Sequence, residues 1–335
     1  MVKTGEGLSV SVVVPVYNGE STIGKCIESL LLQDFPAQRF EVVIVENGST
    51  DGTTGIVSRY PVRLLHNTVR GPSAARQFGL GQSVADVIAF TDADCYADPH
   101  WLSELTKPYT DLRVGGVGGP ILGYKHPERN VVEQFADDKL PLINFTTPRD
   151  GEYMPRLHTC NASYRRALVQ KIGGFDTRLI TADDTDLSWR LQLQTGAALA
   201  YAPKAVVYHH HRTTQHGLAK QYRQYGFAEI LLDTMYGQLP GYPRTRLWQV
   251  RRMLGQVWAL PRYALLVAIW RLRSLAGRAT AYQTENPRLC MLAETSNLRG
   301  KWDGLKATHF MTNASGVLSI DAGQLINRYF QSEKE

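Results

Sequence analysis

Short runs of apolar and β-branched residues divide the first third of the chain into predicted strands. Residues 9–15, 40–45 and 87–91 are the clearest runs, and residues 59–65 form a weaker one. Within them, apolar residues mostly follow one another instead of alternating with polar ones. Because strands buried on both faces show this pattern, the runs predict a parallel sheet covered by helices.

Helix-period patterns lie between and after these strands. Residues 21–33 have apolar residues at helical spacing, and Ser21 can cap this helix. Further helices are predicted within residues 73–80, 130–136, 158–176 and 179–196, and a further strand over residues 198–208. Strand–helix alternation predicts the α/β class, with a central, mostly parallel, Rossmann-like sheet and flanking helices.

Polar residues follow directly where three of the predicted strands end. They are Tyr17 and Asn18, Glu46 and Asn47, and Asp92 and Asp94. An unpaired carboxylate buried in a strand costs several kcal/mol or more, so we expect Asp92 and Asp94 just beyond the strand, facing something cationic. Ligands of open α/β sheets bind at the carboxyl ends of the strands, which makes this edge the expected site. Solvated loop carboxylates are the alternative.

A second acidic group precedes the helix predicted within residues 179–196. It contains Asp183, Asp184 and Asp186. The helix N-terminus favours anions, and crowded carboxylates raise one another's pKa, which suits a general base. Ordinary helix capping is the alternative, and it is the preferred interpretation for Asp186.

Three consecutive histidines, His209 to His211, follow the strand predicted over residues 198–208. A neutral imidazole at a strand end can ligate a metal ion. Alternation along an extended chain would place His209 and His211 on one side and His210 on the other. The alternative is a histidine cluster exposed to water.

The C-terminal part of the chain differs in charge from the rest. Residues 241–335 hold 14 Lys and Arg against 6 Asp and Glu, whereas residues 1–240 hold 23 against 25. Within residues 244–278, arginines alternate with tryptophans and long aliphatic residues, and Gln256, Pro261 and Arg262 interrupt the most apolar stretch. This pattern predicts a helix lying at an anionic membrane surface rather than spanning it. A helical pair packed on the catalytic domain or on a partner subunit remains an equal alternative, and nucleic acid is not an expected partner.

Composition adds the expected cellular location. The four cysteines are scattered without a C-x-x-C pair, which argues against a structural zinc site or a disulfide framework and suits a reducing compartment. The first 20 residues do not have the order of basic, apolar and small residues that marks a signal peptide. We therefore expect a cytoplasmic protein, with peripheral contact to the inner face of the cell membrane if residues 244–278 bind lipid.

Eight segments between residues 9 and 226 together resemble the inverting family 2 glycosyltransferases of GT-A fold, of bacterial type. In chain order they are VVVPVYNGE, VENGSTDGT, GPSAARQFG, FTDAD, NASYRR, GGFD, DDTDLSWRL and VVYHHH. The resemblance implies a GT-A catalytic domain over residues 1–226. Residues 1–125 would form its nucleotide-sugar half and residues 126–226 its acceptor half. Residues 227–335 would form a basic, mainly helical extension.

On the donor side, the resemblance implies a divalent cation, Mg²⁺ or Mn²⁺, that bridges the diphosphate of a nucleotide-sugar. Asp94 would ligate it, and Asp92 would face the ribose or the metal, with Ala93 between them. His209 is the favoured further ligand and His211 the second choice. The other implied donor-binding residues are Pro15, Tyr17, Asn18, Glu20, Glu46, Asn47 and Arg76, the last of these toward phosphate. Glu46 and Asn47 replace the family's usual two aspartates. A UDP-sugar is favoured because uracil is common in the family.

On the acceptor side, the resemblance implies that Asp184 is the catalytic base and that Asp183 replaces the family's usual glutamate. Asn161, Arg165 and Arg166 lie where the family lines the acceptor site. The predicted function is metal-dependent, inverting transfer of a sugar to a hydroxyl of a glycan, a lipid-linked or a small-molecule acceptor, by a chain that can form a homo-oligomer. The alternatives are an inactive nucleotide-sugar or glycan-binding module and a sugar-1-phosphate nucleotidyltransferase.

Overall fold

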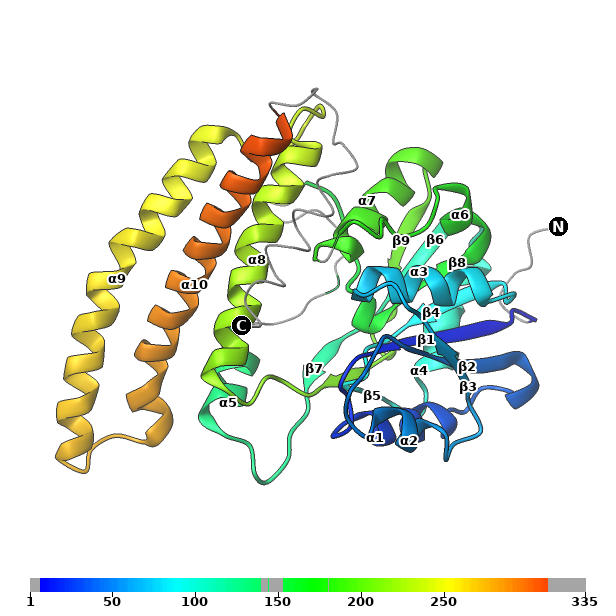
Figure 1. The fold of residues 1–335 in the computed structure, drawn as a ribbon, viewed down its shortest axis with the longest axis horizontal. Coiled ribbons are helices and arrows are strands. Elements are labelled where there is room, and N and C mark those ends of the chain that lie inside the picture. Colours follow the sequence, from blue (N-terminus) through cyan, green and yellow to red (C-terminus); the bar gives the residue numbers. More distant parts are fainter. Residues whose placement is uncertain (1–6, 140–143, 145–152, 180, 313–335) are drawn as a thin grey trace. The chain divides into compact units, whose positions relative to one another are not determined.

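The computed structural model describes residues 7–139, 144, 153–179 and 181–312. The chain forms two compact units (Figure 1). The first consists of residues 1–124 and 142–210, and the second of residues 125–141 and 211–335. We call them the α/β unit and the helical unit. The predicted catalytic domain ends at residue 226, inside a helix of the helical unit, and this functional division remains a prediction.

A seven-stranded, mostly parallel sheet forms the centre of the α/β unit, as predicted. Its strands lie in the order β3 (Arg63–His66), β2 (Phe40–Glu46), β1 (Val10–Val16), β4 (Val87–Phe90), β8 (Ala162–Arg165), β6 (Val114–Gly118) and β9 (Ala198–Tyr201). Strands β1 to β4 are parallel to one another, whereas β8 runs antiparallel between β4 and β6. The carboxyl ends of β1, β2 and β4 therefore share one edge of the sheet.

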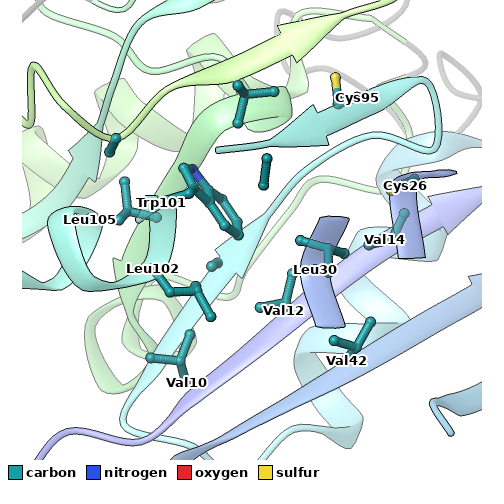
Figure 2. Close-up of a cluster of buried hydrophobic side chains, with 14 of the residues drawn as sticks. Val10, Val12, Val14, Cys26, Leu30, Val42, Cys95, Trp101, Leu102 and Leu105 are labelled. Atoms are coloured by element: carbon teal, nitrogen blue, oxygen red, sulfur yellow. The ribbon is translucent and has the colours of Figure 1, made fainter. Parts of the chain in front are cut away.

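Helices cover both faces of this sheet (Figure 1). The helices of the unit are α1 (Ile23–Leu31), α2 (Thr53–Val57), α3 (Pro72–Gln82), α4 (Trp101–Thr106), α6 (Arg166–Lys171) and α7 (Asp183–Thr195), with short 3₁₀ turns at Ala37–Arg39, Lys107–Thr110 and Thr159–Asn161. On one face Val12 and Val14 pack with Leu30 and Trp101 (Figure 2), and on the other Val13 belongs to a second buried cluster. The continuous apolar strands are thus buried on both sides.

The sequence predicted one strand over residues 198–208, and this prediction is wrong. The segment forms β9 in the large sheet and β10 (Val207–His209) in a separate three-stranded sheet with β5 (Cys95–Ala97) and β7 (Ile121–Gly123). Pro203 lacks the N–H group that a strand ladder needs, and Ala205 N donates to Ala202 O in a turn (3.1 Å). The break moves His209 into the small sheet.

Four helices make up the described part of the helical unit. They are α5 (Val131–Lys139), α8 (Gln215–Tyr236), α9 (Arg246–Leu275) and α10 (Ala281–Thr312). Helix α10 packs against the other three. Its Gly300 lies so close to α8 that a Cβ atom there would come within 1.8 Å of the Arg223 carbonyl oxygen. In the described part of the chain, one helix, Leu247–Leu275, has the length and composition to cross a membrane.

Candidate active site

The loops after β1 and β2 are joined by side-chain hydrogen bonds at the carboxyl edge of the sheet. Asn18, with φ of 50°, accepts from Thr50 N through its Oδ1 atom (2.8 Å). Gly52 N donates to Glu20 Oε2 (3.1 Å). Pro15 pairs with Val45 inside the sheet, so it supports this edge from below. These hydrogen bonds therefore hold the predicted residues of the nucleotide pocket together. We call the surface of Pro15, Tyr17, Asn18 and Glu20 the braced surface.

Tyr17 offers the exposed ring of this surface. Its side chain is 43% exposed, and the Arg70 guanidinium lies 5.7 Å from the ring centroid. An aromatic ring and a guanidinium at the mouth of a site are suited to stacking on a nucleobase.

Glu46 and Asn47 are buried and hold neighbouring loops. Ser49 N donates to Glu46 Oε1, and His66 Nδ1 lies 3.2 Å from Glu46 Oε2. Burial raises the pKa of Glu46, but these hydrogen bonds outweigh burial and leave the pKa below its usual value. Asn47 donates to the carbonyl of Val69 (2.7 Å) and accepts from Gly71 N (2.7 Å). The side chains fix the shape of the edge.

Asp92 and Asp94 lie between β4 and β5, as predicted, and His209 joins them. Strands β5 and β10 pair antiparallel with Cys95 opposite His209. His209 Nε2 is thereby held 3.7 Å from Asp94 Oδ1. Ligand atoms of Asp94, Cys95 and His209 all lie within 4.8 Å of one another. A carboxylate oxygen and an imidazole nitrogen this close fit one divalent cation.

Arg76 connects the Asp92 side of the site with the start of α7. Its guanidinium is buried and bonds Asp92 Oδ1 through NH2 (2.7 Å) and Asp183 Oδ2 through NH1 (2.9 Å). Burial lowers the pKa of Arg76, but the two carboxylates outweigh it and raise the pKa. Arg76 therefore ties together two acidic groups that lie about 90 positions apart in the sequence. Its predicted contact with phosphate remains a prediction.

Asp184 lies in the first turn of α7 and pairs with a histidine that the sequence analysis did not single out. His158 Nδ1 and Asp184 Oδ2 are 3.0 Å apart, and Thr185 N donates to Asp184 Oδ1 (2.6 Å). Burial raises the pKa of Asp184, but His158 and the positive charge of Arg156 outweigh it and hold the pKa below its usual value.

The expectation that crowding raises the pKa of the proposed base is therefore wrong for Asp184. The pKa of Asp183 is raised instead. Burial is the main cause and the charge of Asp184 adds to it, whereas Arg76 acts in the opposite direction. The lowered pKa keeps the Asp184 carboxylate ionised at neutral pH.

Three of the predicted acceptor residues have their side chains engaged elsewhere. Arg165 lies at the opposite end of β8, facing Val87 where β4 begins, and its guanidinium donates to the carbonyls of Val114 and Tyr109 (2.8 Å each). Because β8 is antiparallel to β4, each step from Ala162 to Arg165 leads away from the carboxyl edge. The structure does not bring Arg165 to the site.

Asn161 does lie near the carboxyl end of β4, but it is fully buried. Its amide donates to the carbonyls of Pro120 and Ala205 (2.8 Å each) and accepts from Trp101 Nε1 (2.8 Å). All of its hydrogen-bonding groups are engaged within the unit, so it supports the site from beneath. Arg166 likewise bonds a backbone carbonyl, that of Ala85 (2.7 Å).

His211 belongs to the helical unit, unlike His209. Its Nε2 atom lies 3.7 Å from Asp137 Oδ1 on α5. Strand β10 ends at His209, so the extended alternation that grouped His209 with His211 does not continue. Of the two predicted histidine ligands, the structure brings His209 alone next to Asp94.

Sequence reasoning missed His158 and Cys95 as members of the site. His158 opens a segment, HTCNASYRR, whose polar residues were noted only from Asn161 onward. Cys95 directly follows Asp94 and was considered only in the cysteine count. For Cys95 the available signal was its position next to Asp94, whereas His158 lies three positions before Asn161 and had no such signal.

Comparison with known proteins finds one family model and several relatives that match this chain. Residues 11–173 match the model of glycosyl transferase family 2. Glycosyltransferase AglE of Haloferax volcanii is 29% identical over 223 residues, which cover 64% of this chain and 71% of AglE. The pre-mycofactocin glycosyltransferase of Mycobacterium tuberculosis is also 29% identical, over 61% of this chain but only 43% of the relative.

The fold resembles that of solved structures. The mannosyltransferase PcManGT from Pyrobaculum calidifontis, in complex with GDP-Man and Mn²⁺, has a TM-score of 0.57 and 23% sequence identity, over 90% of each chain. Staphylococcus aureus TarS has a TM-score of 0.51 and 20% identity, over 88% of this chain and 55% of TarS. These likenesses agree with the GT-A-like architecture of the α/β unit.

Proposed function

We propose that this chain, which carries a family 2 glycosyltransferase domain, transfers a sugar from a nucleotide-diphospho-sugar to a hydroxyl acceptor with inversion and with the help of a divalent cation. The observation that supports this most is the Arg76 link. It holds Asp92, beside the candidate metal ligands, and Asp183, beside the candidate base, on one guanidinium. Donor-side and acceptor-side carboxylates therefore meet at one edge of the sheet.

Asp94 and His209 would hold the cation, with Asp92 facing the ribose or the same ion. Bound there, Mg²⁺ or Mn²⁺ would neutralise charge on the diphosphate. The carboxylate oxygen of Asp94 and the imidazole of His209 are 3.7 Å apart, and the complex of PcManGT contains Mn²⁺. His211 is not part of this proposal.

The braced surface of Pro15, Tyr17, Asn18 and Glu20 would receive the nucleotide. Tyr17 and Arg70 would stack on the base, whereas Glu46 and Asn47 would keep the edge in shape through their own hydrogen bonds. We favour a UDP-sugar as donor, and the GDP-Man complex of PcManGT makes GDP-sugars the first comparison.

Asp184 would act as the base. Its carboxylate is held by His158 and Thr185 and is ionised at neutral pH. It accepts the proton of the acceptor hydroxyl while the hydroxyl oxygen bonds to the anomeric carbon, and the bond from that carbon to the diphosphate breaks. A single displacement of this kind inverts the anomeric configuration. The acceptor would be a glycan, a lipid-linked or a small-molecule hydroxyl.

The test is a panel of UDP- and GDP-sugars with Mg²⁺, Mn²⁺ or a chelator, scored for nucleoside diphosphate release and for donor binding. We expect one donor to be turned over only with a divalent ion. Asp94→Ala should lose metal-dependent donor binding, and Asp98→Ala, at the far end of β5, should not. Turnover that is unchanged by the chelator and by Asp94→Ala would contradict the proposed cation site.

The cellular setting is proposed as cytoplasmic, with peripheral contact to the inner face of the membrane. An inactive binding module of the same fold is disfavoured because candidate metal ligands and an ionised carboxylate occur together at the edge. Donor binding without turnover of any donor and acceptor would favour that alternative instead.

A further inference from the structure

Helix α9, the yellow helix in Figure 1, carries exposed large apolar side chains along most of its length. They are 41% to 77% exposed and are Leu247, Val250, Leu254, Val257, Trp258, Leu265, Ile269 and Leu272. Their spacing of three, four and seven residues places them on one side of the helix. We call this row the outer face of α9. A helix of 30 residues is about 45 Å long, so the row is extended.

The opposite side of α9 packs on α10 through polar as well as apolar contacts. Gln256 donates to Glu294 (2.7 Å) and Asn297 (2.9 Å) and accepts from Lys301 (2.9 Å). The buried Lys301 ammonium also pairs with Glu229 on α8 (3.0 Å). Charged and amide groups at the middle of a hydrocarbon layer are costly, which disfavours a helix with these contacts crossing a bilayer. Helix α9 can instead lie on one.

The charged side chains of the α9 segment itself have a single sign. Residues 244–278 contain eight arginines and no lysine, aspartate or glutamate. Arg252 pairs inward with Glu229 (3.5 Å). Among the described residues, no carboxylate lies within ion-pair distance of five exposed arginines, namely Arg251, Arg262, Arg271, Arg273 and Arg278. Guanidinium groups that lack a carboxylate partner beside an apolar row are complementary to anionic headgroups above a hydrocarbon layer.

A second copy of the chain fits this surface poorly. A two-fold contact brings the same surface patch of both copies together, so the arginines of one copy would face those of the other. Like charges facing each other oppose association. The charge therefore favours an anionic partner over self-association.

We infer that the outer face of α9 docks flat on an anionic phospholipid bilayer, with the apolar row in the boundary between headgroups and acyl chains and the arginines on the phosphates. This goes beyond the sequence analysis in naming the face that binds. It does not depend on the proposed reaction, because membrane binding needs neither donor nor turnover.

The experiment is flotation of the full chain with vesicles of phosphatidylcholine alone or mixed with phosphatidylglycerol. We expect binding to the anionic vesicles and release as salt is raised. The triple variant Leu254→Ser, Trp258→Ser, Leu265→Ser should bind at least about 100-fold less well. Its control is Leu32→Ser, Val84→Ser, Leu112→Ser in the α/β unit, where the replaced side chains are 57% to 83% exposed. The control should bind like wild type.

A second variant tests the charges while leaving the apolar row intact. Arg262→Gln, Arg271→Gln, Arg273→Gln should lower binding to anionic vesicles by roughly 100-fold. The control Arg59→Gln, Lys171→Gln, Lys204→Gln removes the same charge from exposed positions of the α/β unit and should bind like wild type. Circular dichroism of all four variants confirms that each is folded.

Four results would overturn the inference. The wild-type chain binds no anionic vesicle, or the outer-face variants bind as tightly as their controls. Alternatively, alkaline carbonate fails to extract the protein from vesicles, which indicates a spanning helix. Finally, sedimentation without lipid shows a dimer that the apolar triple variant dissolves, which assigns the outer face to a second copy.

Discussion

The carboxyl edge of the sheet and the outer face of α9 differ in which side chains they bury and in whether the charged ones have partners. At the edge, charged groups are partly or fully buried; Arg76 has two carboxylate partners and Asp184 has the His158 imidazole within 3.0 Å. On α9, apolar side chains are exposed, and arginines such as Arg262 and Arg271 have no carboxylate partner among the described residues. The buried charges of the edge thus have partners within the chain. The exposed side chains of the outer face have none of this kind, and the proposed bilayer would supply their partner.

The largest effect that tests this contrast comes from replacing one arginine in each region by glutamine. Arg76→Gln leaves the buried carboxylate of Asp183 without its countercharge and should lower the free energy of unfolding by about 3 to 5 kcal/mol. Arg262→Gln on α9 removes a guanidinium with no partner and should change the unfolding midpoint little. Urea unfolding followed by circular dichroism measures both. Equal effects of the two substitutions would contradict the contrast.

Leucines extend the same comparison to apolar side chains. Leu105 is fully buried beside the sheet, and Leu105→Ala should lower the free energy of unfolding by about 3 kcal/mol. Leu254 is 52% exposed on the outer face, and Leu254→Ala should lower the free energy of unfolding by less than about 0.5 kcal/mol. Thermal unfolding in the absence of lipid separates the two. A large loss for Leu254→Ala would show that the outer face already packs within the chain.

Asn47 tests whether hydrogen bonds shape the edge. Asn47 is buried, and Asn47→Ala leaves Gly71 N without its acceptor. The substitution should lower the free energy of unfolding by about 2 kcal/mol. Asn67→Ala is the matched control, since Asn67 makes its side-chain bonds near the surface and should cost less. Chemical unfolding of both variants shows which of them loses more unfolding free energy. A larger loss of unfolding free energy for Asn67→Ala than for Asn47→Ala would contradict the role of Asn47 in shaping the edge.

The smallest expected effect is the pH dependence due to Glu46. Its pKa in the folded protein lies below the usual value, so the unfolded chain holds this proton more tightly. The stabilisation is therefore present above about pH 4 and is lost as the pH falls further. Glu46→Gln should make the fall of unfolding free energy with acidification less steep. An unchanged slope between wild type and variant would contradict the assigned shift.

The sequence predicted the α/β class and the strand-end location of the site because both depend on local patterns. Continuous apolar runs mark buried parallel strands, and Asp92 and Asp94 follow one of them directly. The same reasoning failed where a local break mattered. Pro203 divided the predicted last strand, and this division placed His209 beside Asp94 and His211 in the helical unit.

Long-range contacts account for what the sequence could not predict in the site. The Arg76 bridge joins residues far apart in the chain, and no local pattern encodes it. The direction of β8 decides that Arg165 points away from the edge, and strand direction is not visible in a four-residue run. The pairing of His158 with Asp184 set the sign of the pKa shift, which crowding alone had predicted wrongly.

The most direct test of the central claim is a paired measurement on Asp184→Asn. Donor binding and the rate of transfer at saturating donor are measured in the same preparation with the same divalent ion. We expect that donor binding is kept and that the rate falls by about 10² to 10⁴. A variant that transfers sugar at the wild-type rate would contradict the assignment of Asp184 as the base.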